Sequence, residues 1–424
     1  MGNAVLITLN SDIEEIESLA KSIDHKIIKV FFQHREKPDV NTYVGRGKIK
    51  EIKEFLENKE VDLIIVDGEL KPSQWFKLEK EFEKEVYDRV RLILSLFAKR
   101  AESMEAKLQV KLAQLQYERP FVRELIHRAR AGEHPGFMAG GEYQVDDYYE
   151  MIKRQMKDIR KKLEKLRVGR ELRRKHRYEA GFYLIAIAGY TNAGKSSLLN
   201  LLSEERVKVE EMLFSTLSPT TRKISKKFLS TVGKPPLLLT DTVGFIKDLP
   251  SWIIDAFHST LEEIAVADLI LLMVDLSEPV DKIRTKLKTS LKELVEISAE
   301  SPILLVFNKI DRISSEQEMN NKIENLMDII DNRPYICISV NKRLNIDELF
   351  TAISKNLPSF VEIKMSLPLN KESQRFISLL HERTWIMDIK YSDKILVHLA
   401  TNQRVSEKII EMVKQIDGRI LTAK

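Results

Sequence analysis

Eight consecutive residues have the types and the spacing of a loop that binds phosphate. They follow the apolar run 182–188 and match the pattern G-x-x-x-x-G-K-[ST]. Glycines let the backbone curl so that its amide groups point at a polyphosphate, while the lysine reaches the outer phosphates and the final hydroxyl can ligate Mg²⁺. The eight residues are Gly189, Tyr190, Thr191, Asn192, Ala193, Gly194, Lys195 and Ser196. We predict a nucleotide site in which Lys195 also stabilises charge on the transferred phosphoryl group.

A second motif, Asp241-Thr242-Val243-Gly244, follows the apolar residues 237–239. A carboxylate at the end of a strand can support the Mg²⁺ shell, and the Gly244 amide can donate to a γ-phosphate. The pattern D-x-x-G is common in turns, so it indicates a nucleotide site only because it follows the phosphate loop in the chain. We expect all four residues to lie at the nucleotide.

A third motif predicts which base is bound. The apolar run 303–307 ends in Asn308-Lys309-Ile310-Asp311. Asp311 can accept hydrogen bonds from N1 and N2 of guanine, a donor pair that adenine lacks, while Lys309 lies across the base and Asn308 braces the loop. Farther on, a backbone amide within Ser339-Val340-Asn341 can meet the guanine O6. The expected ligand is therefore GTP or GDP.

The segment between the phosphate loop and Asp241 is rich in hydroxyl groups, as is typical of a switch loop in which a threonine closes over Mg²⁺. We favour Thr216 as that metal ligand and catalytic residue, and Thr220 and Thr221 are close alternatives. The expected contacts from this loop are Phe214, Ser215, Thr216, Leu217 and Ser218.

The elements that must position these residues follow from the hydrophobic pattern. Short apolar runs alternate with helical spacing over residues 1–91 and again over 179–357, which predicts an α/β domain with a parallel sheet in each range, the second a P-loop nucleotide-binding domain. Residues 358–424 predict a small α+β module without evident chemistry, with strands at 361–365 and 394–399 and helices at 370–383 and 405–416. Between the first two, residues 92–131 and 145–178 are polar and nearly free of glycine, which predicts an antiparallel helical hairpin over 92–178 with a glycine-rich tip at 132–141.

The second hairpin helix is strongly basic. Between Lys153 and Arg177 there are thirteen Lys or Arg residues and three acids, whereas the whole chain has a net charge of +5. A mixed-charge run is usually a solvated helix face, but unopposed like charges repel one another. We therefore expect a polyanionic partner, most plausibly nucleic acid bound through its phosphates.

Composition narrows the class of protein. The chain has 424 residues, 43% of them hydrophobic, and one cysteine, Cys337, which excludes a disulfide framework. No signal peptide, lipidation motif or membrane-spanning run is evident in the sequence. We expect a soluble, cytoplasmic and monomeric protein without a membrane anchor.

The motifs in this order resemble the translation-factor-related GTPases, and the strings at 189–196, 213–222 and 241–246 are similar to those of the HflX family. The resemblance extends to Asn41-Thr42-Tyr43-Val44-Gly45-Arg46-Gly47-Lys48 and to residues 106–115. It implies a GTPase that docks on the large ribosomal subunit and acts in translation, in ribosome rescue or splitting, or in ribosome assembly. The tip departs from the family pattern, because Gly140-Gly141-Glu142 stands where Gly-Pro-Gly-Glu is usual.

Phe245 stands where many small GTPases have a glutamine that orients the attacking water, so we expect slow intrinsic hydrolysis and stimulation by a partner. His258 and a residue supplied by the partner are open alternatives for positioning the water. Two alternatives to the leading function remain: a GTPase that acts on a protein partner, and an ATPase acting on free RNA, which conflicts with residues 308–311. At residues 45–48, a glycine loop that touches RNA or turns the chain is favoured over a second phosphate-binding turn.

Overall fold

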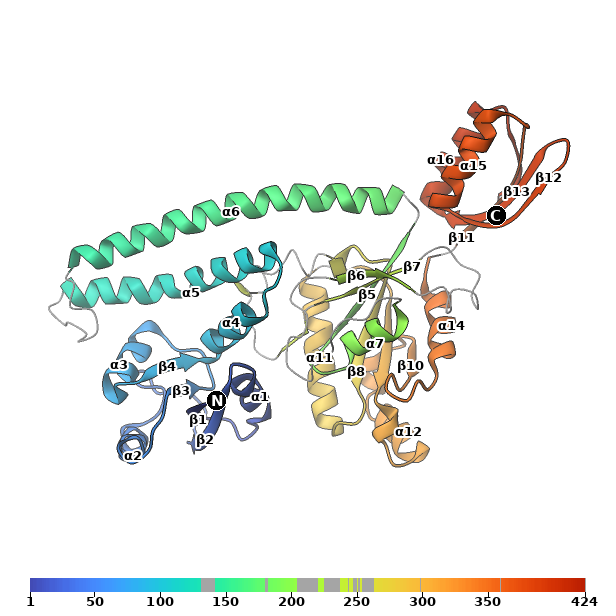
Figure 1. Cartoon of the computed structure of the whole chain (residues 1–424). Helices are drawn as coiled ribbons and strands as arrows, with labels where there is room; N and C mark the ends of the chain where they lie inside the picture. The colour runs from blue at the N-terminus through green and yellow to red at the C-terminus, as the bar shows by residue number, and fades with distance from the viewer. Residues whose placement is uncertain are drawn as a thin grey trace. The chain divides into compact units, whose positions relative to one another are not determined.

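The computed structural model describes residues 1–130, 142–179, 182–203, 220–224, 237–242, 244–246, 250, 252–253, 263–297, 299–358 and 360–423. Within these ranges the chain forms three β-sheets, each with its own helices (Figure 1). No helix in these ranges is both long enough and apolar enough to cross a membrane.

The first sheet has four parallel strands in the order β2-β1-β3-β4. The strands are β1 (Gly2–Thr8), β2 (His25–Phe32), β3 (Leu63–Val66) and β4 (Glu85–Asp88). All four residues of β3 are buried, as expected for a parallel strand covered on both faces. Between the strands run α1 (Glu14–Ser22), α2 (Arg46–Glu57) and α3 (Pro72–Phe82), so the predicted α/β alternation is confirmed.

The first hairpin helix differs from its prediction. A single helix was expected over 92–131, but the structure has α4 (Arg89–Arg100) and α5 (Met104–Arg130). The Ser103 hydroxyl accepts a hydrogen bond of 3.1 Å from the Ala106 amide, an N-cap that starts a new helix. Apolar periodicity continues across the break, which is why the sequence pattern did not reveal it.

The long helix α6 (Glu142–Glu179) packs antiparallel to α5 (Figure 1). Their shared core contains Leu115 and Ile126 of α5 and Ile152, Met156 and Ile159 of α6. The predicted hairpin is thus present, while its glycine-rich tip at 132–141 lies outside the described residues.

The second sheet has six strands in the order β10-β9-β8-β5-β7-β6, and all neighbours are parallel except β6 and β7. The strands are β5 (Tyr183–Gly189), β6 (Thr220–Lys223), β7 (Leu237–Asp241), β8 (Leu269–Asp275), β9 (Ile303–Asn308) and β10 (Tyr335–Cys337). Parallel strands place their carboxyl ends at one edge, where ligands of such sheets bind. The described motif residues lie at these strand ends or directly after them.

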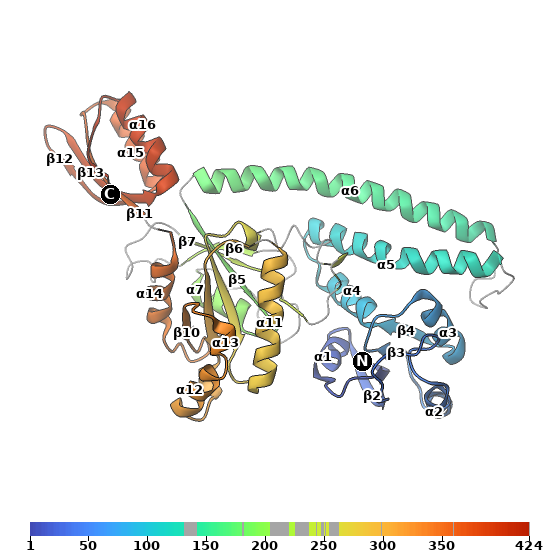
Figure 2. The same cartoon turned by 180° about the vertical axis from the view of Figure 1, so that it is seen from behind.

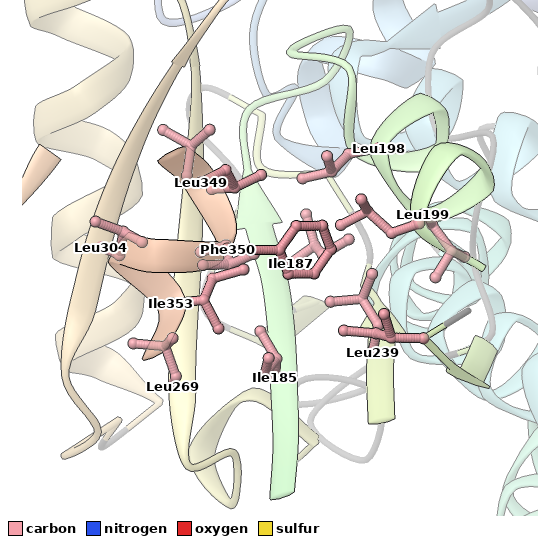
Figure 3. Packing of buried hydrophobic residues seen from close by; sticks show 14 of the residues in the cluster. Ile185, Ile187, Leu198, Leu199, Leu239, Leu269, Leu304, Leu349, Phe350 and Ile353 are labelled. Carbon is pink, nitrogen blue, oxygen red and sulfur yellow. The ribbon is translucent and has the colours of Figure 1, made fainter. Parts of the chain in front are cut away.

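Helices hold this sheet from both sides. Figure 3 shows Leu198 and Leu199 of α7 (Lys195–Leu202) and Phe350 of α14 (Ile346–Asn356) packed against Ile187 of β5 and its neighbours. The opposite face is covered by α11 (Val280–Glu296), as Figure 2 shows. Two short helices, α12 (Glu316–Glu324) and α13 (Met327–Ile330), follow β9.

The third sheet is antiparallel, with the order β12-β13-β11-β14. Its elements are β11 (Phe360–Leu367), α15 (Lys371–Arg383), β12 (Trp385–Tyr391), β13 (Ile395–Asn402), α16 (Gln403–Gln415) and β14 (Arg419–Ala423). The βαββαβ order is that of a ferredoxin-like fold. The sequence pattern predicted β11, β13 and both helices but missed the edge strands β12 and β14, because most of their residues are exposed.

Candidate nucleotide site

The loop between β5 and α7 has the backbone that its glycines predict. Gly189 and Gly194 have φ angles of +138° and +98°, a region that side chains rarely adopt. A Cβ at Gly189 would lie 2.4 Å from the Met273 carbonyl oxygen, and one at Gly194 would lie 2.3 Å from Asn308 Nδ2. Both positions therefore require glycine for conformation and for space.

The Lys195 side chain lies inside this loop. Only 7% of the residue is exposed, and its ammonium donates a hydrogen bond of 2.8 Å to the Tyr190 carbonyl oxygen. Burial lowers the pKa of Lys195 to about 8, with Asp241 acting weakly in the opposite direction. A buried ammonium with one neutral partner is a strong attractor for a polyphosphate.

Two oxygen-bearing side chains meet beside the lysine. Ser196 Oγ donates a hydrogen bond of 2.7 Å to Asp241 Oδ2, and Asp241 is 1% exposed at the end of β7. Thr242 fixes the turn, because its hydroxyl donates to the Ile187 carbonyl oxygen at 2.7 Å and its amide donates to Asp241 Oδ1 at 3.0 Å. The pair offers hard oxygen donors of the kind that Mg²⁺ binds.

The next segment is hydrogen-bonded to the phosphate loop. The Phe245 amide donates to the Gly189 carbonyl oxygen, the Thr191 amide donates to the Phe245 carbonyl oxygen, and each distance is 3.0 Å. A Cβ at Gly244 would lie 2.8 Å from Thr191 Cγ2 and 3.0 Å from Lys195 Nζ. The Phe245 ring is buried, with 4% of the residue exposed, so it presents no group to an attacking water.

Asn308 links the phosphate loop to the base side. Its Nδ2 donates to the Ala193 carbonyl oxygen at 2.9 Å, and its Oδ1 accepts from the Val340 amide at 3.1 Å. With 3% of the residue exposed, these bonds satisfy a buried amide. The Asn308 side chain thus joins the phosphate loop to the 339–341 loop.

The other base-side residues cluster around this amide. Lys309 has a φ of +66°, and Ile310 and Asp311 form the short 3₁₀ turn Ile310–Arg312. Asp311 Oδ1 accepts a hydrogen bond from the Ser339 hydroxyl. The Ser339 amide donates to the Leu344 carbonyl oxygen, whereas the exposed Asn341 amide makes no hydrogen bond within the described part of the chain. Among the described residues 339–341, the Asn341 amide is therefore the one without a hydrogen bond.

Several expected site residues lie outside the described ranges: Phe214, Ser215, Thr216, Leu217, Ser218, Val243 and His258. The alternatives to Thr216, Thr220 and Thr221, lie on β6 in register with Asp241 and Thr240. The second glycine-rich turn at residues 45–48 begins α2, and there Lys48 forms an ion pair of 2.6 Å with Glu51.

Sequence reasoning missed the loop after β8. Lys286 of α11 lies 5.0 Å from the centre of the Tyr190 ring and pairs with Glu278 at 2.6 Å, so this loop backs the phosphate loop. Asp275, the last residue of β8, pairs with Lys309. The available signal was an acid, Asp275, directly after the apolar run 269–274.

Comparisons with known proteins agree with this geometry. Three family models match consecutive parts of the chain: "GTP-binding GTPase N-terminal" over residues 10–98, "GTP-binding GTPase Middle Region" over 100–177 and "50S ribosome-binding GTPase" over 184–309. A "GTPase HflX" of Thermococcus kodakarensis is 38% identical over 95% of this chain and 91% of its own. One of Methanocaldococcus jannaschii is 39% identical over 95% and 96%. A crystal structure described as the complex of SsGBP with GDP aligns with 28% identity and a TM-score of 0.50, over 84% of this chain and 98% of that one.

Proposed function

The chain belongs to the HflX family of GTPases, proteins that bind and hydrolyse GTP, and on that premise we propose that it acts on the large ribosomal subunit. Its task there is in translation, in the rescue or splitting of ribosomes, or in their assembly. The match of residues 184–309 to the family model of a "50S ribosome-binding GTPase" supports this choice. The observation that carries it is a row of cations on α6.

The row consists of Arg154, Lys157, Lys161 and Lys165, all exposed. Spacings of three and four residues put them on one face of the helix, away from the buried stripe that packs on α5. At a rise of 1.5 Å per residue they cover about 17 Å of helix. None of the four forms an ion pair within the described ranges, and neither do their neighbours Arg160 and Lys162.

Such a row fits a nucleic-acid backbone. Cations held several ångströms apart on a rigid rod repel one another unless phosphates neutralise them, and binding then releases counterions. The face lacks interleaved aromatic rings, so contacts to phosphate rather than stacked bases are expected. Ribosomal RNA is the polyanion that the family membership favours.

At the nucleotide, we assign the phosphates to the 189–196 loop and the guanine to Asp311 and the 339–341 loop. Ser196 and Thr216 would hold Mg²⁺ directly, with Asp241 supporting its shell. Mg²⁺ usually takes few protein ligands beside substrate phosphates, so two side chains suffice for such a site. When bound, the ion neutralises charge on the β- and γ-phosphates.

Hydrolysis by this site is expected to be slow alone. The buried Phe245 ring offers nothing to orient water, so the remaining groups, Lys195 and the Gly244 amide, act only on phosphate charge. A partner that completes the site would then control the rate. That behaviour suits a factor whose GTP is consumed only on its target.

Charge reversal on α6 tests the ribosomal role. A variant with Lys157, Lys161 and Lys165 changed to Glu is compared with a control in which three exposed lysines of the GTPase domain, Lys288, Lys292 and Lys355, are reversed. Co-sedimentation with large ribosomal subunits is measured from low to moderate salt. We expect the α6 variant to lose binding and to show a salt slope smaller by about one for each phosphate contact removed, while the control binds like the parent protein. Equal binding of the two variants at all salt concentrations would contradict the proposal.

A further inference from the structure

An acid lies at the end of the strand next to the base-binding loop. Asp275 ends β8, and it is in register with Asn308, which ends β9. Lys309 follows Asn308, and its Nζ lies 2.6 Å from Asp275 Oδ2. The two side chains are 15% and 9% exposed, so this pair is largely shielded from solvent.

The Asp275 carboxylate is itself held in place. Its Oδ1 accepts hydrogen bonds from the Ser277 amide at 3.0 Å and from the Ser277 hydroxyl at 2.6 Å. From α12, Lys322 Nζ donates to the carbonyl oxygens of Leu276 and Glu278 at 3.1 and 3.2 Å. The acid therefore sits on a fixed loop and has one oxygen left for Lys309.

The ion pair with Asp275 orders the Lys309 side chain, so that its methylene stem can pack against one side of the base. A lysine side chain has four rotatable carbon–carbon bonds, and ordering it costs up to about 2 kcal/mol. A carboxylate that binds the ammonium beforehand removes that cost from nucleotide binding and leaves the methylene stem extended. Preorganisation of this kind raises affinity without adding any contact to the ligand.

We propose that Asp275 is a positioning residue for guanine nucleotides, because it holds Lys309 so that the lysine stem forms one wall of the base site. The inference rests on the proposed role of Lys309 at the base. Asp275 does not touch the nucleotide, so its effect must pass through Lys309 entirely. If the ion pair served only the stability of the fold, nucleotide binding would not depend on Asp275 through Lys309.

The test is a double-mutant cycle on nucleotide release. Asp275→Asn, Lys309→Met and the double variant are loaded with fluorescent GDP or fluorescent inosine diphosphate, and dissociation rates and affinities are measured. Lys309→Met keeps the stem and removes the charge. Asp328→Asn is the matched control, since it removes one acid from the ion pair with Arg284 in the same domain.

We expect Asp275→Asn to weaken GDP binding about tenfold, within the range of coupling between contacting residues. Inosine diphosphate should weaken by the same factor, because the stem packs against rings that both bases share. Added to Lys309→Met, the Asp275 substitution should cause no further loss. Asp328→Asn should bind like the parent protein.

Three results would overturn the inference. The first is parent-like GDP binding by Asp275→Asn, and the second is an equal further loss when that change is added to Lys309→Met. The third is parent-like binding by Lys309→Met, because this variant keeps the stem and loses only the charge, so the tether to Asp275 would then have no effect on the base site. If Asp275→Asn does not fold, Ser277→Ala loosens the same carboxylate and should give a smaller loss with the same dependence on Lys309.

Discussion

Ser196 Oγ donates a hydrogen bond of 2.7 Å to Asp241 Oδ2, which joins the first turn of α7 to the end of β7. The two residues are 45 positions apart in the chain and come from different motifs. Their contact brings a hydroxyl and a carboxylate together beside Lys195. We propose that these two groups form the magnesium subsite, because hydroxyl and carboxylate oxygens are the donors that Mg²⁺ prefers.

Removal of the Ser196 hydroxyl should weaken nucleotide binding only in the presence of magnesium. We expect Ser196→Ala to lower the affinity for GTP by about tenfold with Mg²⁺, the scale of one lost charge-assisted contact, and to match the parent protein when the metal is chelated. Equilibrium binding of a fluorescent GTP analogue measures both conditions. Ser197→Ala, one residue farther along α7, is the control, and an equal Mg²⁺-dependent loss there would count against the assignment.

A glutamine at position 245 should not orient the attacking water as the glutamine of other GTPases does. The Phe245 ring is buried, and its backbone is bonded to Gly189 and Thr191, so a glutamine there leaves an amide without partners. We expect Phe245→Gln to lower the free energy of unfolding by about 1–3 kcal/mol and to leave GTP turnover no faster. Thermal melting and phosphate release check this, with Phe245→Leu as the apolar comparison. A large rise in turnover would show that the side chain reaches the reacting phosphate.

Asp311 should determine the preference for guanine over adenine nucleotides. Its carboxylate is the acceptor that matches the N1 and N2 donors of guanine, so Asp311→Ala should abolish the preference for GDP over ADP. Competition of the two nucleotides against fluorescent GDP measures the ratio. Asp347→Ala, an exposed acid on α14, should keep the preference. A ratio that survives in Asp311→Ala would place base recognition elsewhere.

The buried Lys195 gives a pH dependence of known sign. Its pKa is about 8 in the folded protein, against 10.5 in the unfolded chain, so between these pH values the unfolded state binds more protons. Burial of the charged ammonium therefore lowers the free energy of unfolding most below pH 8, and this destabilisation fades as the pH rises from 8 to 10.5. Lys195→Met removes this destabilisation at every pH. In the absence of nucleotide, we expect the free energy of unfolding of this variant at pH 7 to exceed that of the parent protein by on the order of 3 kcal/mol at most. We expect this difference, followed by thermal or denaturant melting, to shrink toward pH 10. A difference that grows with pH would contradict the burial argument.

Local sequence signals predicted the parts of the fold that are buried on both faces. The apolar runs of β5, β7 and β9 stood out because parallel strands under two helical layers tolerate few polar residues. The strand ends then placed Lys195, Asp241 and Asn308 at one edge. What the pattern missed lies at exposed edges, as in β12 and β14, or at a break that only a serine cap marks, as at Ser103.

The contacts of the nucleotide site were harder to predict from the sequence than the strands of the sheet. Motif spacing predicted that Asn308 braces the base-binding loop, which stays a prediction; in the structure its side chain is hydrogen-bonded to Ala193 and Val340. Asp275 gave no motif, because its meaning comes from lying in register with Asn308 and next to Lys309, a tertiary relationship between separate strands. The pairing of Phe245 with the phosphate loop is of the same kind, since backbone bonds leave no trace in residue type.

The most direct test of the central claim is GTP turnover by the purified protein with and without large ribosomal subunits, run beside their co-sedimentation in GTP and in GDP. We predict slow turnover alone, a clear acceleration by the subunits, and tighter association in GTP than in GDP. The α6 charge-reversal variant should lose the acceleration while keeping the slow basal rate. Turnover that large subunits leave unchanged, together with no association at low salt, would contradict the ribosomal role and leave a GTPase that acts on a different partner.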